Sequence, residues 1–174
     1  MTRAVLSLGS NLGDRGATLA AAVSVFAPSV VATSSVFQTP PWGPVEQDDF
    51  YNLVLIVSAD GMDAAGWLAL CHRAEQAAGR ERLVRWGPRT LDADVIAVWD
   101  EAGPVTNDDP VLTLPHPRAF ERAFVLAPWL EVEPDAELPG HGPIVALLRA
   151  IDATEREAVR SIGPLVEQGP ASRS

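Results

Sequence analysis

The order of short apolar runs along the chain is the feature that most limits the folds it can adopt. Four runs are short and rich in β-branched and apolar side chains, which is typical of strands: residues 3–8, 30–37, 50–58 and 91–98. A further short strand is predicted over 111–117, and a last one near 158–165.

Two helices are predicted between these runs. Asp14 can cap a helix whose apolar residues recur at positions 19, 22, 23 and 26. A second helix begins near Asp63, carries Trp67 and Cys71 on one face and ends at Gly79. The resulting order, β-α-β-β-α-β, is the ferredoxin-like α+β motif, a mainly antiparallel sheet with both helices on one face. Helices near 118–130 and 143–151 would extend this core.

Length and composition indicate one globular domain. The chain has 174 residues, of which 47% are hydrophobic and 21% charged. We expect a single domain over 1–166 and a flexible tail over 167–174. No apolar run reaches the roughly 18 residues of a membrane span, and the first residues do not resemble a signal peptide. We therefore expect a cytoplasmic protein, with Cys71 as a core residue. A monomer is also expected.

The distribution of charge excludes some functions. A net charge of −10 argues against a nucleic-acid-binding protein, which needs a broad basic face. All 13 basic residues are arginine, and the absence of lysine excludes a Walker A loop. Arg80, Arg82, Arg85 and Arg89 nevertheless lie close together in the chain. They form either a solvated loop or a site for anions.

Two acids in the strand that follows these arginines suggest what such a site binds. Asp92 and Asp94 are two residues apart, so their side chains point to the same side of a strand, with Ile96 further along that side. At an effective dielectric near 20, carboxylates about 6 Å apart repel by roughly 3 kcal/mol, so in a cleft they need a cation such as Mg²⁺. On the surface they need none. Acids, metal, phosphate and arginine together are typical of phosphoryl transfer.

The residues around this acid pair also resemble a known family. The run RWGPRTLDADVI resembles the signature of 6-hydroxymethyl-7,8-dihydropterin pyrophosphokinases. Four further segments are similar to that family and follow in its order: SLGSNLGD at 7–14, QTPPWGP at 38–44, FYN at 50–52 and TLPHPRAFERAFVLAPW at 113–129. The resemblance implies transfer of the β,γ-diphosphate from ATP to the pterin hydroxymethyl group, with two Mg²⁺ ions bound by Asp92 and Asp94.

The resemblance also implies roles for individual residues. Those implied for catalysis are Arg82, Arg89, Asp92 and Asp94. Those implied for ATP binding are Arg80, Trp86, Arg89, Ile96, Thr113, His116 and Arg122. Because the segment before Trp86 is about one residue shorter than in well-known members, the choice of catalytic arginine among Arg80, Arg82 and Arg85 stays open.

For the pterin, the resemblance implies a ring stacked between Phe50 and Phe124, with its polar edge bound by Asn52 and by the loop of Thr39, Pro40 and Trp42. Strand alternation independently places Phe50 and Asn52 on one face. Both phenylalanines could equally be ordinary core residues.

Several assignments stay open at this stage. Glu75 is either a partner of an arginine in the 80–85 segment or a surface charge, and His72 and His141 fit partly exposed and loop positions. Two rival functions remain: another magnesium-dependent phosphoryl or nucleotidyl transferase on this scaffold, or a non-enzymatic ferredoxin-like ligand-binding module.

Overall fold

One antiparallel sheet is the centre of the molecule. The computed structural model describes residues 1–41, 43–79 and 90–166. Within these ranges the sheet has seven strands in the order β6-β5-β1-β4-β3-β9, and β2 also pairs with β4. The strands are β1 (Thr2–Ser10), β2 (Val30–Thr33), β3 (Phe37–Thr39), β4 (Phe50–Ala59), β5 (Asp92–Asp100), β6 (Gly103–Pro104) and β9 (Arg160–Ser161).

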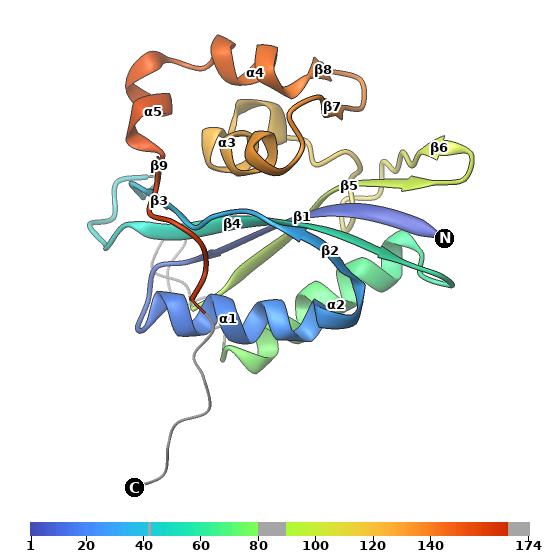
Figure 1. Ribbon diagram of the computed structural model, residues 1–174, viewed down its shortest axis with the longest axis horizontal. Coiled ribbons are helices and arrows are strands. Elements are labelled where there is room, and N and C mark those ends of the chain that lie inside the picture. The colour runs from blue at the N-terminus through green and yellow to red at the C-terminus, as the bar shows by residue number, and fades with distance from the viewer. Residues whose placement is uncertain (42, 80–89, 167–174) are drawn as a thin grey trace, which may run out of the picture.

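Helices cover both faces of the sheet (Figure 1). On one face lie α1 (Arg15–Phe26) and α2 (Ala64–Ala77). The other face carries α3 (Ala123–Val132), with α4 (Ile144–Ala150) and α5 (Ala153–Ala158) on the same side. The remaining elements are the 3-10 turns η1 (Ala27–Ser29) and η2 (Ala119–Glu121) and the small hairpin of β7 (Glu137–Leu138) and β8 (Gly142–Pro143). None of the helices in these ranges is long and apolar enough to cross a bilayer.

The central strand β1 supplies residues to two hydrophobic clusters. Leu6 and Leu8 face α1 and α2 and join the cluster that contains Trp67, whereas Val5 joins the cluster around Trp129 of α3. From Ala4 onward every residue of β1 is buried. A strand buried on both faces needs apolar side chains at successive positions, which explains the nearly continuous apolar run at the amino terminus.

The predicted ferredoxin-like order is confirmed. The four main strands form the antiparallel order β5-β1-β4-β2, and both crossover helices lie on one face. Both predicted N-caps are present: Asp14 Oδ1 accepts a hydrogen bond from the Ala17 amide at 3.0 Å, and Asp63 Oδ1 accepts one from the Gly66 amide at 2.7 Å. Gly79, with φ +67°, follows α2, and Cys71 is fully buried.

The predicted strand over 30–37 is wrong in one respect, because it is two strands. Ser34 interrupts it: its amide donates to the Val54 carbonyl at 3.0 Å, but its hydroxyl oxygen accepts from the Val54 amide at 2.9 Å. A side-chain atom thus replaces the backbone acceptor, which breaks the regular ladder between β2 and β3.

Predictions for the C-terminal third were less accurate. Residues 111–117 form turns with one isolated bridge, Asn107 to Leu114, and no strand, because their prolines lack the amide that a ladder requires. The α3 helix begins at Ala123, after η2, and the last strand is only the two residues of β9. The sequence pattern did not predict α5, and the predicted tail lies outside the described residues.

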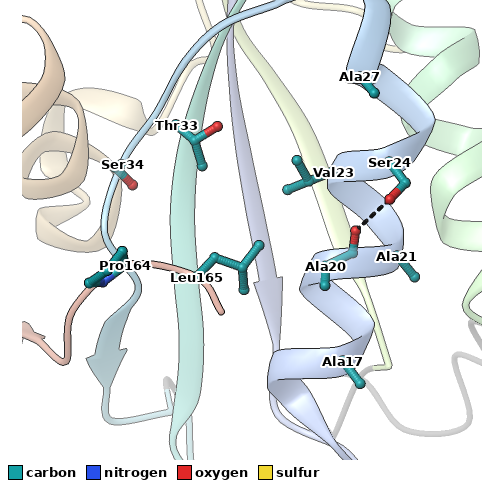
Figure 2. A pocket seen from close by; sticks show the side chains of 10 residues that line it. All are labelled: Ala17, Ala20, Ala21, Val23, Ser24, Ala27, Thr33, Ser34, Pro164 and Leu165. Atoms are coloured by element: carbon teal, nitrogen blue, oxygen red, sulfur yellow. Dashed lines mark hydrogen bonds between the residues drawn. The ribbon is translucent and has the colours of Figure 1, made fainter. Parts of the chain in front are cut away.

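After β9 the chain crosses the edge of the sheet toward α1. The Ile162 amide donates to the Val36 carbonyl at 2.9 Å, and the Val36 amide donates to the Gly163 carbonyl at 2.8 Å. Pro164 and Leu165 then form one wall of an open groove of about 670 Å³ whose other wall is α1 (Figure 2). None of the described residues predicted for the functional site lines this groove.

We predict that Asp63→Ala lowers the free energy of unfolding by about 1 kcal/mol, because it removes the N-cap of α2. Asp63→Ser should restore most of the loss, and Asp60→Ala, at an exposed turn, is the matched control. Urea denaturation measures all three. Equal stability of Asp63→Ala and the unaltered chain would contradict the role of the cap.

Candidate active site

The predicted acid pair lies where β5 begins. Asp92 and Asp94 are half-buried and point to the α3 side of the sheet, as alternation with the buried Ala93 requires. Asp92 is paired with Gly9 of β1, and Asp94 with Ser7. The predicted nearness of the two acids on one face is therefore present in the fold.

Arg122 at the start of α3 faces this pair. Its Nη1 lies 3.6 Å from Asp94 Oδ2, and the two side chains are 17% and 35% exposed. The guanidinium carbon of Arg122 also lies 5.6 Å from the ring centre of Phe124, which is half-buried in the first turn of α3. Arg122 thus connects the acid pair with one of the aromatic residues predicted for the pterin.

His116 is held as a neutral imidazole beside these groups. Its amide donates to the Ile96 carbonyl at 2.8 Å, and its Nδ1 accepts from the Arg118 amide at 3.2 Å. Burial, and after it the positive charge of Arg122, lowers the pKa of His116 to about 4. Because Nδ1 is an acceptor, the proton of the neutral ring lies on Nε2, which can donate to an anion.

The side chains of the other two described residues predicted for ATP, Ile96 and Thr113, make contacts within the protein. The side chain of Ile96 is fully buried in the cluster under α3, so that only its backbone carbonyl is engaged near His116. Thr113 is half-buried, and its hydroxyl donates to the Asp109 carbonyl at 3.0 Å.

The residues predicted for the pterin meet at the end of β4. Asn52 is 4% exposed, and its Nδ2 donates to Thr39 Oγ1 of β3 at 2.7 Å. A Cβ atom at Gly9 would lie 2.5 Å from Asn52 Oδ1 and 3.5 Å from Phe50 Cδ1. Phe50 and Asn52 therefore share a face, and only glycine fits opposite them. Pro40, which follows β3, is exposed.

The register of β1 brings the two groups of residues together. Gly9 pairs with Asn52 on one side and with Asp92 on the other. Neighbouring strands are about 4.8 Å apart, so the Asn52 and Asp92 backbones are only about 10 Å from each other. Asp92 and the buried amide therefore lie at one level of three adjacent strands, and Asp94 lies two residues further along β5, opposite Ser7. All three side chains are on the face of the sheet that α3 covers, which Figure 1 shows from the side.

The 7,8-dihydro-6-hydroxymethylpterin-pyrophosphokinase family model matches residues 5–134 of the chain. The chain belongs to this family. A Mycobacterium tuberculosis relative is 42% identical in an alignment of 185 residues, which covers 100% of this chain and 98% of the relative. A Mycobacterium leprae relative is 49% identical in an alignment of 169 residues, which covers 92% of this chain and 88% of the relative. Both are 2-amino-4-hydroxy-6-hydroxymethyldihydropteridine pyrophosphokinases. The predicted family is confirmed, and the chain is an ATP-dependent pyrophosphokinase of folate biosynthesis.

Solved structures support the fold. The chain resembles a triple mutant of Plasmodium falciparum HPPK-DHPS with a TM-score of 0.65 at 12% identity, over 92% of this chain and 46% of that one. The wild-type protein has a TM-score of 0.60 at 14% identity, over 84% and 44%. The chain spans less than half the length of those proteins, and at such identity the likeness shows the fold alone.

Glu75 has a buried role that the sequence did not predict, and its alternative partner, an arginine of the 80–85 segment, lies outside the described residues. Glu75 is 8% exposed, so the alternative of a surface charge is wrong, and its Oε1 accepts a hydrogen bond from the Ala93 amide at 3.0 Å. Glu75 thus holds the backbone between the two acids from the α2 side. Its spacing of four from Cys71 placed it near the buried stripe of the helix, which was the available signal.

The cysteine and the two histidines other than His116 are Cys71, His72 and His141. Burial raises the pKa of the Cys71 thiol, and the negative charges of Asp94 and Glu75 raise it further, so this residue stays protonated. His72 is exposed, and His141 lies in the turn after β7, stacked on Phe120 with ring centres 4.9 Å apart. The predicted residues that lie outside the described ranges are Trp42, Arg80, Arg82, Arg85, Trp86 and Arg89.

We predict that Gly9→Ala lowers the free energy of unfolding by about 1–3 kcal/mol, because the new methyl group displaces the Asn52 amide from Thr39. Gly16→Ala in α1 is the matched control, since its Cβ would have nothing nearer than an Asp14 oxygen at 3.8 Å. Chemical denaturation compares the two. Equal stabilities would mean that Asn52 does not need its present position.

The pH dependence of stability should report on His116. Its pKa is about 4 in the folded chain and near the ordinary value of 6.5 when unfolded, so the unfolded state binds the proton more readily. The free energy of unfolding should therefore fall as the pH drops from 6.5 toward 4. His116→Gln should flatten this part of the curve, measured by urea denaturation at several pH values. An unchanged slope in the variant would contradict a neutral, half-buried His116.

Proposed function

We propose that the chain carries out the reaction of its family at the end of the sheet where β1, β4 and β5 meet. This reaction transfers the β,γ-diphosphate of ATP to the hydroxymethyl group of 6-hydroxymethyl-7,8-dihydropterin and releases AMP. The single observation that carries the proposal is the register of Gly9, which pairs with both Asn52 and Asp92. A pterin bound at the first and a nucleotide bound at the second would be neighbours.

The acid pair fits a magnesium site. Mg²⁺ commonly uses one or two carboxylates and takes its remaining ligands from water and phosphate, and Asp92 and Asp94 are two half-exposed carboxylates on one face. In the described part of the chain no third histidine, cysteine or acid joins them as a ligand, which leaves positions for a triphosphate. We propose two ions, which when bound would neutralise the phosphates and orient the attacking hydroxyl.

Donors and positive charge beside the acids suit a triphosphate. Arg122 stays charged and presents a planar fork, and His116 offers Nε2–H without adding charge. Thr113 and Ile96 are the other proposed ATP contacts in the described ranges. Arg80, Trp86, Arg82 and Arg89 follow the family motif, and Arg82 and Arg89 are proposed to stabilise the charge that develops on the transferred group.

The pterin is proposed to lie over Gly9 beside Asn52. Because Asn52 Nδ2 donates to Thr39, its Oδ1 is the atom that can accept a hydrogen bond from the amino edge of the ring. Phe50 and Phe124 would stack on the two faces of the ring, and the backbone from Thr39 through Pro40 to Trp42 would complete its polar contacts. The pterin hydroxyl then attacks the β-phosphorus, and the bond from that phosphorus to the α,β-bridging oxygen breaks.

The proposal also includes the oligomeric state, the location and the partners of the chain. We propose a monomer in the cytoplasm that binds ATP and a pterin and does not bind nucleic acid. A net charge of −10 supports the last point, because phosphate backbones would be repelled.

The reaction products and the binding of ATP distinguish the proposed function from its two rivals. Incubation with ATP, Mg²⁺ and the pterin should give AMP and a pyrophosphorylated pterin, whereas ADP or free pyrophosphate would indicate another transferase. Titration calorimetry should show magnesium-dependent ATP binding. A chain that binds no nucleotide would be a ligand-binding module.

We predict that Asp94→Asn lowers kcat about a hundredfold or more while leaving the fold intact, because it removes a charged metal ligand with little change in volume. The ion pair with Arg122 is partly exposed and contributes little stability. Asp100→Asn, at the far end of β5, is the matched control. A parallel loss of thermal stability and activity in Asp94→Asn would make the acid structural.

A further inference from the structure

Arg15, the first residue of α1, contacts the chain on both sides of Phe50. Its Nη1 donates to the Asp49 carbonyl at 2.7 Å, and its guanidinium carbon lies 4.0 Å from the ring centre of Tyr51. A planar guanidinium can stack on a ring and donate hydrogen bonds from its edge at the same time. Arg15 uses both abilities on residues that are adjacent to Phe50 in sequence.

The same short segment is held from a second direction. Gln38 of β3 donates from Nε2 to Asp49 Oδ2 at 3.0 Å, and Gln38 is also the strand partner of Tyr51. The backbone carbonyl of Asp49 is thus bound by α1 and its carboxylate by β3. Asp49 and Tyr51, the two residues that flank Phe50 at the start of β4, are therefore both held in place.

Strand alternation shows why Arg15 cannot itself touch a ligand over Gly9. Tyr51 packs against the cluster on the α1 and α2 side, so Phe50 and Asn52 point to the opposite face. Arg15 acts on the face where Tyr51 lies. Any influence on the site must pass through the backbone of residues 49 to 52.

We propose that Arg15 is a positioning residue of the pterin site, which sets the ring of Phe50 and the amide of Asn52 by holding Asp49 and Tyr51 from the other face. This inference rests on the proposed pterin site. It assigns a role in substrate affinity to the first turn of α1, and it separates Arg15 from the residues around Asp94, which are proposed to serve the nucleotide.

The test compares Arg15→Ala, Arg15→Lys, Tyr51→Phe and Tyr51→Leu with the exposed arginine control Arg73→Ala. KM for the pterin is measured at saturating ATP, KM for ATP at saturating pterin, and thermal stability for every variant. Arg15→Ala should raise the pterin KM about fivefold to tenfold and leave the ATP KM within about twofold. Arg15→Lys should retain part of the effect, since lysine can donate but cannot stack.

The tyrosine variants isolate the stacking contact. Tyr51→Phe keeps the ring and should behave as the unaltered chain, whereas Tyr51→Leu should raise the pterin KM. Adding Arg15→Ala to Tyr51→Leu should then have a smaller effect than Arg15→Ala alone, because the shared contact is already lost.

Two results would overturn the proposal: a pterin KM unchanged in Arg15→Ala, or equal rises in both KM values accompanied by lower thermal stability. If Arg15→Ala does not fold, Arg15→Lys and Tyr51→Leu decide by the same comparison of the two KM values. Failure of the proposed function is a separate result, because the unaltered chain would then form no AMP and no pterin pyrophosphate.

Discussion

The close approach of β4 side chains to β1 at Gly9 is the constraint on which the rest of the site depends. A side chain there would collide with Asn52, so the buried amide is possible only because β1 has glycine at that register. The same residue pairs with Asp92. Side chains alternate between the two faces of a strand. A shift of one residue in the pairing of β1 would therefore place a side chain opposite Asn52 and would end the pairing of Gly9 with Asn52 and Asp92.

The charged and polar groups of the site interact with one another at defined positions. Asp94 faces Arg122, and His116 is kept neutral by burial and by the same arginine. A neutral imidazole beside the Arg122 guanidinium can donate a hydrogen bond to phosphate without repelling that guanidinium. This arrangement suits a reaction in which positioning and charge stabilisation, more than covalent chemistry, lower the barrier.

Groups on the far side of the sheet support the geometry of the site. Glu75 of α2 binds the Ala93 amide between the two acids, and Arg15 of α1 holds Asp49 and Tyr51 beside Phe50. Neither side chain lies on the face that α3 covers. Two helices that belong to the ferredoxin-like core thus fix the backbone from behind, as precise ligand placement requires.

The sequence alone determined the β-α-β-β-α-β core, the helix caps and the position of Asp92 and Asp94 on one face of a strand. Each of these depends on residues close together in the chain, through local periodicity or through a single capping residue. The family followed from contiguous motifs. Tertiary structure alone decided the break at Ser34, the buried acceptor role of Glu75 and the meeting of Asn52 with Asp92 across Gly9. These depend on which strands and helices become neighbours, and contacts between residues far apart in the chain leave no periodic signal.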